Sequence, residues 1–178
     1  MLLLIPVAAL AQIDKYGKAD TVYADIEKLN PNTWTVTISI VNDEYIAGIS
    51  IPLKLSAGKV KIVGDSAVYR GGRVEHFAFK AFRADTAIQC ITMGMLANMG
   101  PTNNTLAPGK GRLCTIYISS FDKKPIEKLS VDTATTQPNN SLMAIADRIQ
   151  RSEPPDTLPI DKYKDAEIVP AFFVREPK

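Results

Sequence analysis

The chain has few of the residues that build metal centres, catalytic triads and disulfide scaffolds. Its 178 residues include one histidine, two cysteines and one tryptophan. Most zinc sites and histidine-based triads are excluded, because such sites need several of these side chains to converge. Cys90 and Cys114 are too far apart in sequence for a Cys-x-x-Cys redox motif. We expect them to pack as small apolar side chains, with a disulfide in an oxidising compartment as the alternative.

The chain also has little net charge and lacks long apolar runs. Its 21 basic and 19 acidic residues give a net charge of +2, too small for phosphate neutralisation over the whole surface to drive nucleic-acid binding. Residues 54–83 are a local exception, with seven basic and two acidic side chains that can attract an anionic partner. No run approaches the roughly 20 apolar residues of a membrane-spanning helix. The sequence therefore predicts no nucleic-acid partner and no membrane span.

The amino terminus has the pattern of an export signal. Residues 1–11 are apolar and end in Ala9-Leu10-Ala11, which predicts a signal peptide cleaved before Gln12, although no Lys or Arg precedes the apolar run. The alternative is a buried N-terminal strand or helix. We expect a protein that is secreted or at the cell surface, extracellular or periplasmic, with residues 12–178 forming one domain, since a domain takes about 150 residues.

Apolar residues alternate with polar ones along most of the remaining chain. Residues 33–40 are the clearest strand, and in 49–55 the side chains of Ser50, Pro52 and Lys54 lie opposite an apolar face. Pro52 cannot donate to a neighbouring strand, so we expect a bulge or an edge on its side. Further strands are predicted at 60–63, 74–82, 87–95, 113–119, 129–131, 142–146 and 168–174, and 142–150 is the one competing helical segment. Strands separated by turn residues predict an all-β fold, an antiparallel β-sandwich.

Two blocks carry a resemblance to a known family. Residues 41–55 hold an Asn-containing turn and a Gly that lead into an alternating strand, and residues 106–118 hold a Pro-Gly turn followed by an alternating strand. In this order they resemble the cohesin-type domain over about residues 20 to 150. The resemblance implies a jelly-roll topology of about nine strands and a secreted, non-catalytic receptor for a small calcium-binding dockerin module. The chain itself has no Asp-x-Asn-x-Asp-Gly loop of the EF-hand type.

The resemblance also implies where a partner binds. It points to a sheet formed by strands at 47–55, 73–82, 87–95 and 113–119. With Phe77 and Phe79 assigned to the core, period-two alternation turns five side chains of these strands outward. These predicted partner-binding residues are Ser50, Lys54, His76, Lys80 and Tyr117. They would suit an acidic partner, and a plain solvated sheet face is the alternative.

Enzymatic motifs are lacking. The sequence has no Gly-x-Ser-x-Gly elbow, no His-Glu-x-x-His helix and no phosphate-binding loop. We therefore predict no catalytic residues, no cofactor and no metal. The alternative function is a carbohydrate-binding module with a polysaccharide ligand, which would use exposed aromatic rings from among Trp34, Tyr45, Tyr69 and Tyr117.

Overall fold

The computed structural model describes residues 17–97, 104–134, 142–145 and 167–176. The predicted signal peptide, residues 1–11, lies outside these ranges. The described residues form strands and no helix, so none of them belongs to a helix that could cross a membrane. The strands are β1 (Thr21–Asn30), β2 (Thr33–Asn42), β3 (Ile46–Ser56), β4 (Ile62–Val68), β5 (Phe79–Asp85), β6 (Cys90–Leu96), β7 (Gly109–Ser120), β8 (Ser130–Thr133), β9 (Leu142–Ile145), β10 (Glu167–Ile168) and β11 (Ala171–Arg175).

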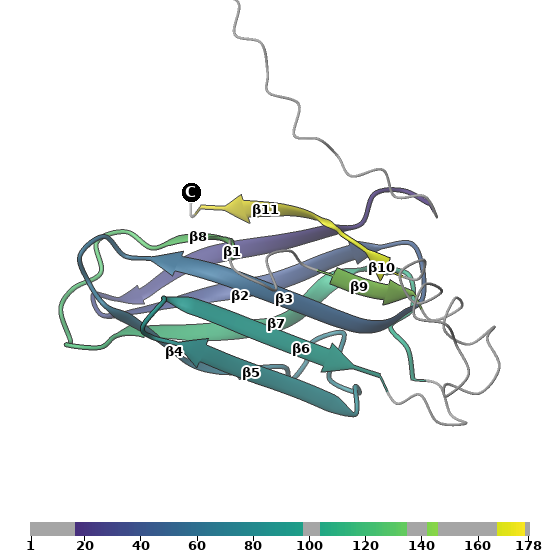
Figure 1. Ribbon diagram of the computed structural model, residues 1–178, viewed down its shortest axis with the longest axis horizontal. Helices are drawn as coiled ribbons and strands as arrows, with labels where there is room; N and C mark the ends of the chain where they lie inside the picture. The colour runs from purple at the N-terminus through teal and green to yellow at the C-terminus, as the bar shows by residue number, and fades with distance from the viewer. Residues whose placement is uncertain (1–16, 98–103, 135–141, 146–166, 177–178) are drawn as a thin grey trace, which may run out of the picture.

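These strands form two sheets that pack face to face (Figure 1). Sheet A has the order β11-β1-β2-β7-β4. Sheet B has the order β10-β9-β3-β6-β5, and β8 pairs with β3 beside β9. All neighbours are antiparallel except β1 and β11, which run parallel. The predicted all-β sandwich is confirmed.

The core lies between the inner faces of the two sheets. Alternate residues of β2 and β3 are buried there, as the period-two pattern predicts. From β2 these are Trp34, Val36, Ile38 and Ile40, and from β3 they are Ile49, Ile51, Leu53 and Leu55. The same alternation leaves the intervening side chains of each strand on the outer faces.

Pro52 lies where β3 changes partner. On one side β3 pairs with β9 up to Ser50 and with β8 from Leu53 onward. The carbonyl of Pro52 accepts from the Ala134 amide at 3.2 Å on this side, so the missing proline N–H also falls there. The central strand β3 can therefore contain this proline, because the pairing on that side is interrupted between β9 and β8. The edge expected on the side of Pro52 is thus confirmed.

The C-terminal segment joins the two sheets at their edge. β10 belongs to sheet B, and after Val169–Pro170 the chain continues as β11 in sheet A. β11 is held on β1 by Phe173, which stacks on Tyr23 at 5.9 Å between ring centroids, and by Arg175, which bonds Asp25 at 2.5 and 2.6 Å. The predicted returning strand is confirmed, but it forms two strands. β1 was not identified in the sequence, and with it the described residues have eleven strands where about nine were expected.

The strand predicted at 74–82 begins later than expected. Residues 70–76 form turns, and Arg73 anchors them through its amide, which donates to the Arg112 carbonyl at 2.8 Å. β5 therefore starts at Phe79. Phe77 is buried as expected, but Phe79 is 55% exposed, so its assignment to the core is wrong. The helical alternative for 142–150 is also wrong for 142–145, which form β9, while the rest lies outside the described residues.

Candidate functional site

The outer face of sheet B carries four rows of side chains that run across the strands. Each row crosses β3, β6 and β5, and on the other side of β3 some rows continue onto β9 or β8. Strand register decides which residues share a row. The rows, from one end to the other, are Ala144-Gly48-Leu96-Phe79, Leu142-Ser50-Gly94-Ala81, Pro52-Thr92-Arg83 and Asp132-Lys54-Cys90-Asp85. The face is thus apolar at one end, lined by small residues in the second row, and polar at the other end.

Gly94 leaves the second row hollow. A Cβ placed there would have no neighbouring atom within 4 Å. Two shallow hollows share Gly94 and Ser50: one of about 430 Å³ extends toward Arg83 and Cys90, and one of about 280 Å³ extends toward Phe79. The middle of the face is therefore open to a convex partner surface.

Two large apolar side chains stand beside this hollow. Phe79 and Leu96 are opposite each other on β5 and β6 and are 55% and 52% exposed. Leu96 leans over Gly48, where its Cδ2 is 2.9 Å from the position that a Cβ would occupy. Contiguous exposed apolar surface marks interaction sites, and this pair forms the apolar end of the face.

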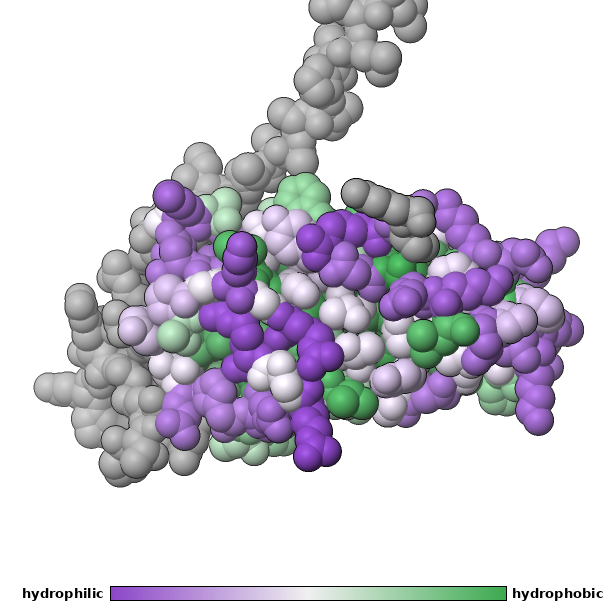
Figure 2. All heavy atoms as spheres, turned by 180° about the vertical axis from the view of Figure 1, so that it is seen from behind, coloured by the Kyte–Doolittle hydropathy of each residue, from purple (hydrophilic) through white to green (hydrophobic). Residues whose placement is uncertain are grey.

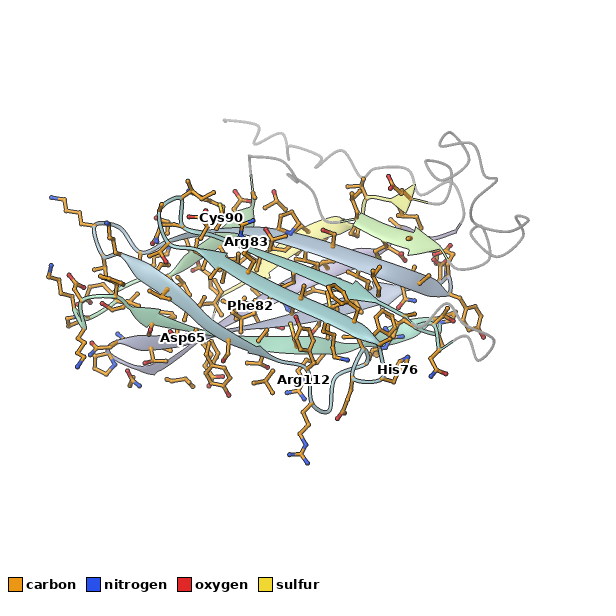
Figure 3. All side chains as sticks on the ribbon, turned by 60° about the horizontal axis from the view of Figure 1, so that its bottom comes forward. Asp65, His76, Phe82, Arg83, Cys90 and Arg112 are labelled. Carbon is orange, nitrogen blue, oxygen red and sulfur yellow. The ribbon has the colours of Figure 1, made fainter. Side chains whose placement is uncertain are left out.

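The opposite end of the face is polar and its hairpin is ordered. Asp85 accepts from the amides of Ala87 and Ile88 at 3.0 and 3.2 Å, and the Lys54 ammonium donates to the Ile88 carbonyl. Arg83 is exposed on β5, and Figure 3 shows it close to Cys90 at this end of the sheet. These contacts hold Asp85 and Lys54 at this end of the face, and Asp85 and Arg83 line the larger hollow.

The five predicted site residues do not share one face. Ser50 and Lys54 lie on the outer face of sheet B. Tyr117 is on β7, which pairs with β2 and β4 in sheet A, so its side chain lies on the other side of the sandwich. His76 is exposed in the turn before β5, edge-on to the Phe77 ring at 5.2 Å. Lys80 pairs with the buried Met95 and donates to the Phe77 and Glu75 carbonyls, so its outward assignment is also wrong.

Sequence reasoning missed the residues that shape this face most. These are Phe79, Ala81, Arg83, Gly94 and Leu96. Gly94 alternates with Ile91, Met93 and Met95 along the strand, so an outward glycine inside a strand is a signal from which sequence could have identified this position. The outward side chains of β5 depend on where the preceding turn ends, which alternation alone does not give.

Comparisons with solved structures identify the architecture. No family model matches the chain, and no curated protein matches it in sequence. The third cohesin of ScaC from Acetivibrio cellulolyticus, solved in complex with the ScaB dockerin, superposes with a TM-score of 0.55 over 87% of this chain and 95% of that chain, at 11% identity. The sixth cohesin of scaffoldin B from the same organism, in complex with a Cel5 dockerin mutant, gives 0.53 over 89% and 99%, at 8% identity. The seventh ScaB type I cohesin from Pseudobacteroides cellulosolvens gives 0.52 over 90% and 94%, at 10% identity.

The chain has the cohesin fold. The fold that the resemblance implied is thus confirmed, and identities of 8 to 11% extend the likeness no further than the fold.

The aromatic candidates for sugar stacking are partly used inside this cohesin-fold module. Trp34 is 6% exposed and its indole N–H donates to the Ile126 carbonyl at 3.3 Å. The Tyr69 hydroxyl donates to the Ala81 carbonyl at 3.3 Å, and burial raises the pKa of Tyr69 to about 12. The Trp34 ring is therefore inside the fold, and the Tyr69 ring is partly buried against the core. Tyr45 and Tyr117 are exposed, Tyr45 before β3 and Tyr117 on sheet A.

The two cysteines of the module are free thiols, one inside the sandwich and one on its outer surface. Cys114 is buried in the core with its Sγ 3.6 Å from the Met93 Sδ. Burial raises the pKa of the Cys114 thiol to about 12, against the opposing effect of Arg112. Cys90 is partly exposed on the outer face of sheet B. The packed interpretation is confirmed for Cys114, and the disulfide alternative is wrong.

Three carboxylates approach one another beside the start of β3. Oxygens of Asp20, Asp43 and Glu44 all lie within 4.8 Å of each other, a spacing at which such groups can hold a cation. Backbone amides already contact two of them: the Lys18 amide donates to Asp43 at 2.7 Å, and the Asp43 amide donates to Asp20 at 3.3 Å. These contacts order the chain as it enters β1.

Proposed function

We propose that this cohesin-fold module is a non-catalytic receptor for a dockerin-type protein module, which docks on the outer face of sheet B. The observation that carries the proposal is the exposed pair Phe79 and Leu96 beside the open row around Gly94. The neighbours in fold support it, because the ScaC and scaffoldin B cohesins were solved with dockerins bound.

The face has the composition of a protein interface. Stable interfaces place a few large apolar anchors in the centre and polar groups at the rim. Here Phe79 and Leu96 would supply the apolar anchors at one end of the face, and Arg83 and Asp85 the polar groups at the other end. The small side chains of Ser50 and Ala81 leave room for a partner backbone to approach the sheet closely.

The module is proposed to act outside the cytoplasm, in keeping with the predicted signal peptide of residues 1–11. The carbohydrate-binding alternative has less support, because Trp34 and Tyr69 are packed into the fold.

Affinity capture with the full chain tests this function. The bait is incubated with the exported fraction of the source organism in calcium or in a calcium chelator, and bound proteins are identified by mass spectrometry. We expect a protein with dockerin repeats to be retained in calcium and lost in chelator. Capture of no such protein by the folded bait would overturn the proposal.

A pair of matched variants locates the binding face. Leu96→Ser removes an exposed apolar side chain from sheet B, and Val68→Ser removes one from sheet A, where Val68 is 41% exposed on β4. We expect Leu96→Ser to lower the affinity for the captured partner by about 10-fold or more, as for an interface anchor. Val68→Ser should leave the affinity unchanged. Equal losses in both variants would contradict the assignment of the face.

A further inference from the structure

Three basic residues lie where the turn after β4 packs against the start of β7. Arg70, Lys110 and Arg112 are all exposed. The Arg112 guanidinium donates to the Arg70 carbonyl at 2.8 Å, which places the two residues together. Within the described ranges the ion pairs join Asp122 with Lys124, Glu176 with Lys128 and Asp25 with Arg175, so none of the three exposed basic residues has a carboxylate partner there.

Glycines leave room for the arginines here. Gly71 has a φ of 69°, and a Cβ there would lie 2.9 Å from the Arg112 Nη2. Gly111 has a φ of 150°, and its Cβ would lie 2.9 Å from the Cδ of Arg73. Other residues rarely adopt such backbone conformations and would push the arginines away. Glycine at 71 therefore leaves room for the Arg112 guanidinium beside this turn, and glycine at 111 leaves room for Arg73.

Arg73 has a different task from the three exposed cations. Its guanidinium donates to the Asn42 side-chain oxygen at 2.8 Å and to the Gly109 carbonyl at 3.0 Å, and it also contacts the Ala107 carbonyl. These bonds fix the start of β7. Lys110 and Arg112 are thereby presented on a rigid strand, two residues apart on the same face.

Arg112 is prepared to bind an oxyanion. Among the described residues, its hydrogen bond runs from Nη2 to the Arg70 carbonyl, which orients the planar guanidinium and leaves its other N–H groups for a ligand. Such a group matches a carboxylate or sulfate with two parallel hydrogen bonds. Figure 3 shows Arg112 at the opposite rim of the sandwich from Arg83 and Cys90.

The surface next to these cations carries hydroxyl groups. On the outer face of sheet A, Ser39 pairs with Arg112, and the Thr37 and Thr115 hydroxyls lie 3.3 Å apart. Tyr117 follows on the same face of β7 and is 36% exposed. Figure 2, the view from behind, shows a surface on which hydrophilic side chains predominate. Hydroxyls both donate and accept, as the hydroxyls of a sugar require.

We propose that Arg70, Lys110 and Arg112 bind an acidic polysaccharide, with its carboxylate or sulfate groups on the cations and its sugar hydroxyls along the row from Ser39 to Tyr117. An acidic peptide or a nucleic acid would use the cations and leave the hydroxyl row without a role. This site is on sheet A, so it is separate from the protein-binding face proposed on sheet B.

The test measures binding of the full chain to immobilised polygalacturonate and dextran sulfate, with neutral dextran as the control polymer. The triple variant Arg70→Ala, Lys110→Ala, Arg112→Ala is compared with Lys59→Ala, Lys61→Ala, Lys123→Ala, which removes the same charge near the opposite end of β7. We expect the site variant to lose about 10-fold or more in affinity for at least one acidic polymer, and the charge-matched variant to lose about twofold at most.

Three results would overturn the proposal: equal losses in the two triple variants, no binding of either acidic polymer by the wild type, or tighter binding of poly-glutamate or single-stranded DNA. The two acidic polymers distinguish a carboxylate from a sulfate ligand. A Thr115→Val variant removes a hydroxyl and no charge. It should lower the affinity for the acidic polysaccharide and leave the affinity for poly-glutamate unchanged. Equal effects of Thr115→Val on both polymers would contradict the role of the hydroxyl row.

Discussion

Ser50 and Gly94 lie directly opposite each other on β3 and β6, and both line the two hollows on the outer face of sheet B. Their small size leaves the backbone accessible in the middle of a sheet whose neighbouring row carries Leu96 and Phe79. A glycine in a strand interior weakens the strand and adds no packing. Its position here is explained if a partner occupies the space above it.

Gly94→Val should therefore fold normally and be slightly more stable than the wild type. A Cβ added at this position meets no atom within 4 Å. Valine also favours the strand conformation, so we expect the free energy of unfolding to rise by up to about 1 kcal/mol. Chemical denaturation measures this change. A loss of more than about 1 kcal/mol would show that the space above Gly94 is already filled in the free protein.

Arg73→Ala should destabilise the fold. The change removes hydrogen bonds to Asn42 and Gly109 and leaves the buried Asn42 side chain without this donor. We expect a loss of about 2 kcal/mol, because a buried acceptor without a partner costs more than the bond itself contributes. Arg70→Ala is the control, since the exposed Arg70 offers only its backbone carbonyl to Arg112, and it should change stability little. Equal effects in urea denaturation would contradict the structural role of Arg73.

Alkaline pH should destabilise the protein through Cys114 and Tyr69. Burial raises the pKa of Cys114 from its usual 9.0 to about 12 and that of Tyr69 from 10.0 to about 12, and in Tyr69 the proximity of Cys114 adds to the increase. The unfolded chain releases these protons at lower pH, so the stabilisation is complete below about pH 9 and is lost as pH rises toward 12. Each group contributes a slope of at most about 1.4 kcal/mol per pH unit.

Urea denaturation at a series of pH values measures this slope. Cys114→Val removes one of the two titrating groups, so it should abolish most of the slope between pH 9.0 and 10.0 and reduce it by about half at higher pH. An unchanged slope in that variant would assign the alkaline loss of stability to other groups.

Arg175→Ala should loosen β11 without unfolding the rest of the sandwich. It removes the ion pair with Asp25 and the contact of the guanidinium with the Tyr23 ring, 4.5 Å from the ring centroid. Because these groups are largely exposed, the effect on global stability should be small. Hydrogen exchange should increase in β11 and in the edge of β1 that pairs with it. Unchanged hydrogen exchange in these strands would show that the backbone pairing and the Phe173 stack are enough to hold β11 on β1.

The sequence allowed much of the fold to be predicted, because alternation is a local signal. It placed Ser50, Pro52 and Lys54 opposite the core face of β3 correctly, and it predicted the returning C-terminal strand. It failed for β1, where the charged residues Asp25, Glu27 and Lys28 obscure the alternation of Val22, Ala24 and Ile26.

The candidate site was predictable only in part, because it depends on which strands are neighbours. Alternation assigns Tyr117 to an outer face but does not say which sheet β7 joins. The outward side chains of β5 were misassigned for a related reason, since the contacts of Arg73 with Asn42 and Arg112 keep 70–76 in turns. Both features come from pairs of residues distant in sequence.

The most direct measurement is a titration of the full chain with the purified protein that the calcium-dependent capture identifies, using Gly94→Arg and Tyr117→Arg. Each variant places the same side chain on an outer face, one on sheet B and one on sheet A. We predict that Gly94→Arg weakens binding by about 30-fold or more, equivalent to about 2 kcal/mol, while Tyr117→Arg binds as the wild type does. Wild-type affinity in Gly94→Arg, with the loss in Tyr117→Arg instead, would contradict the assignment of the outer face of sheet B as the receptor surface.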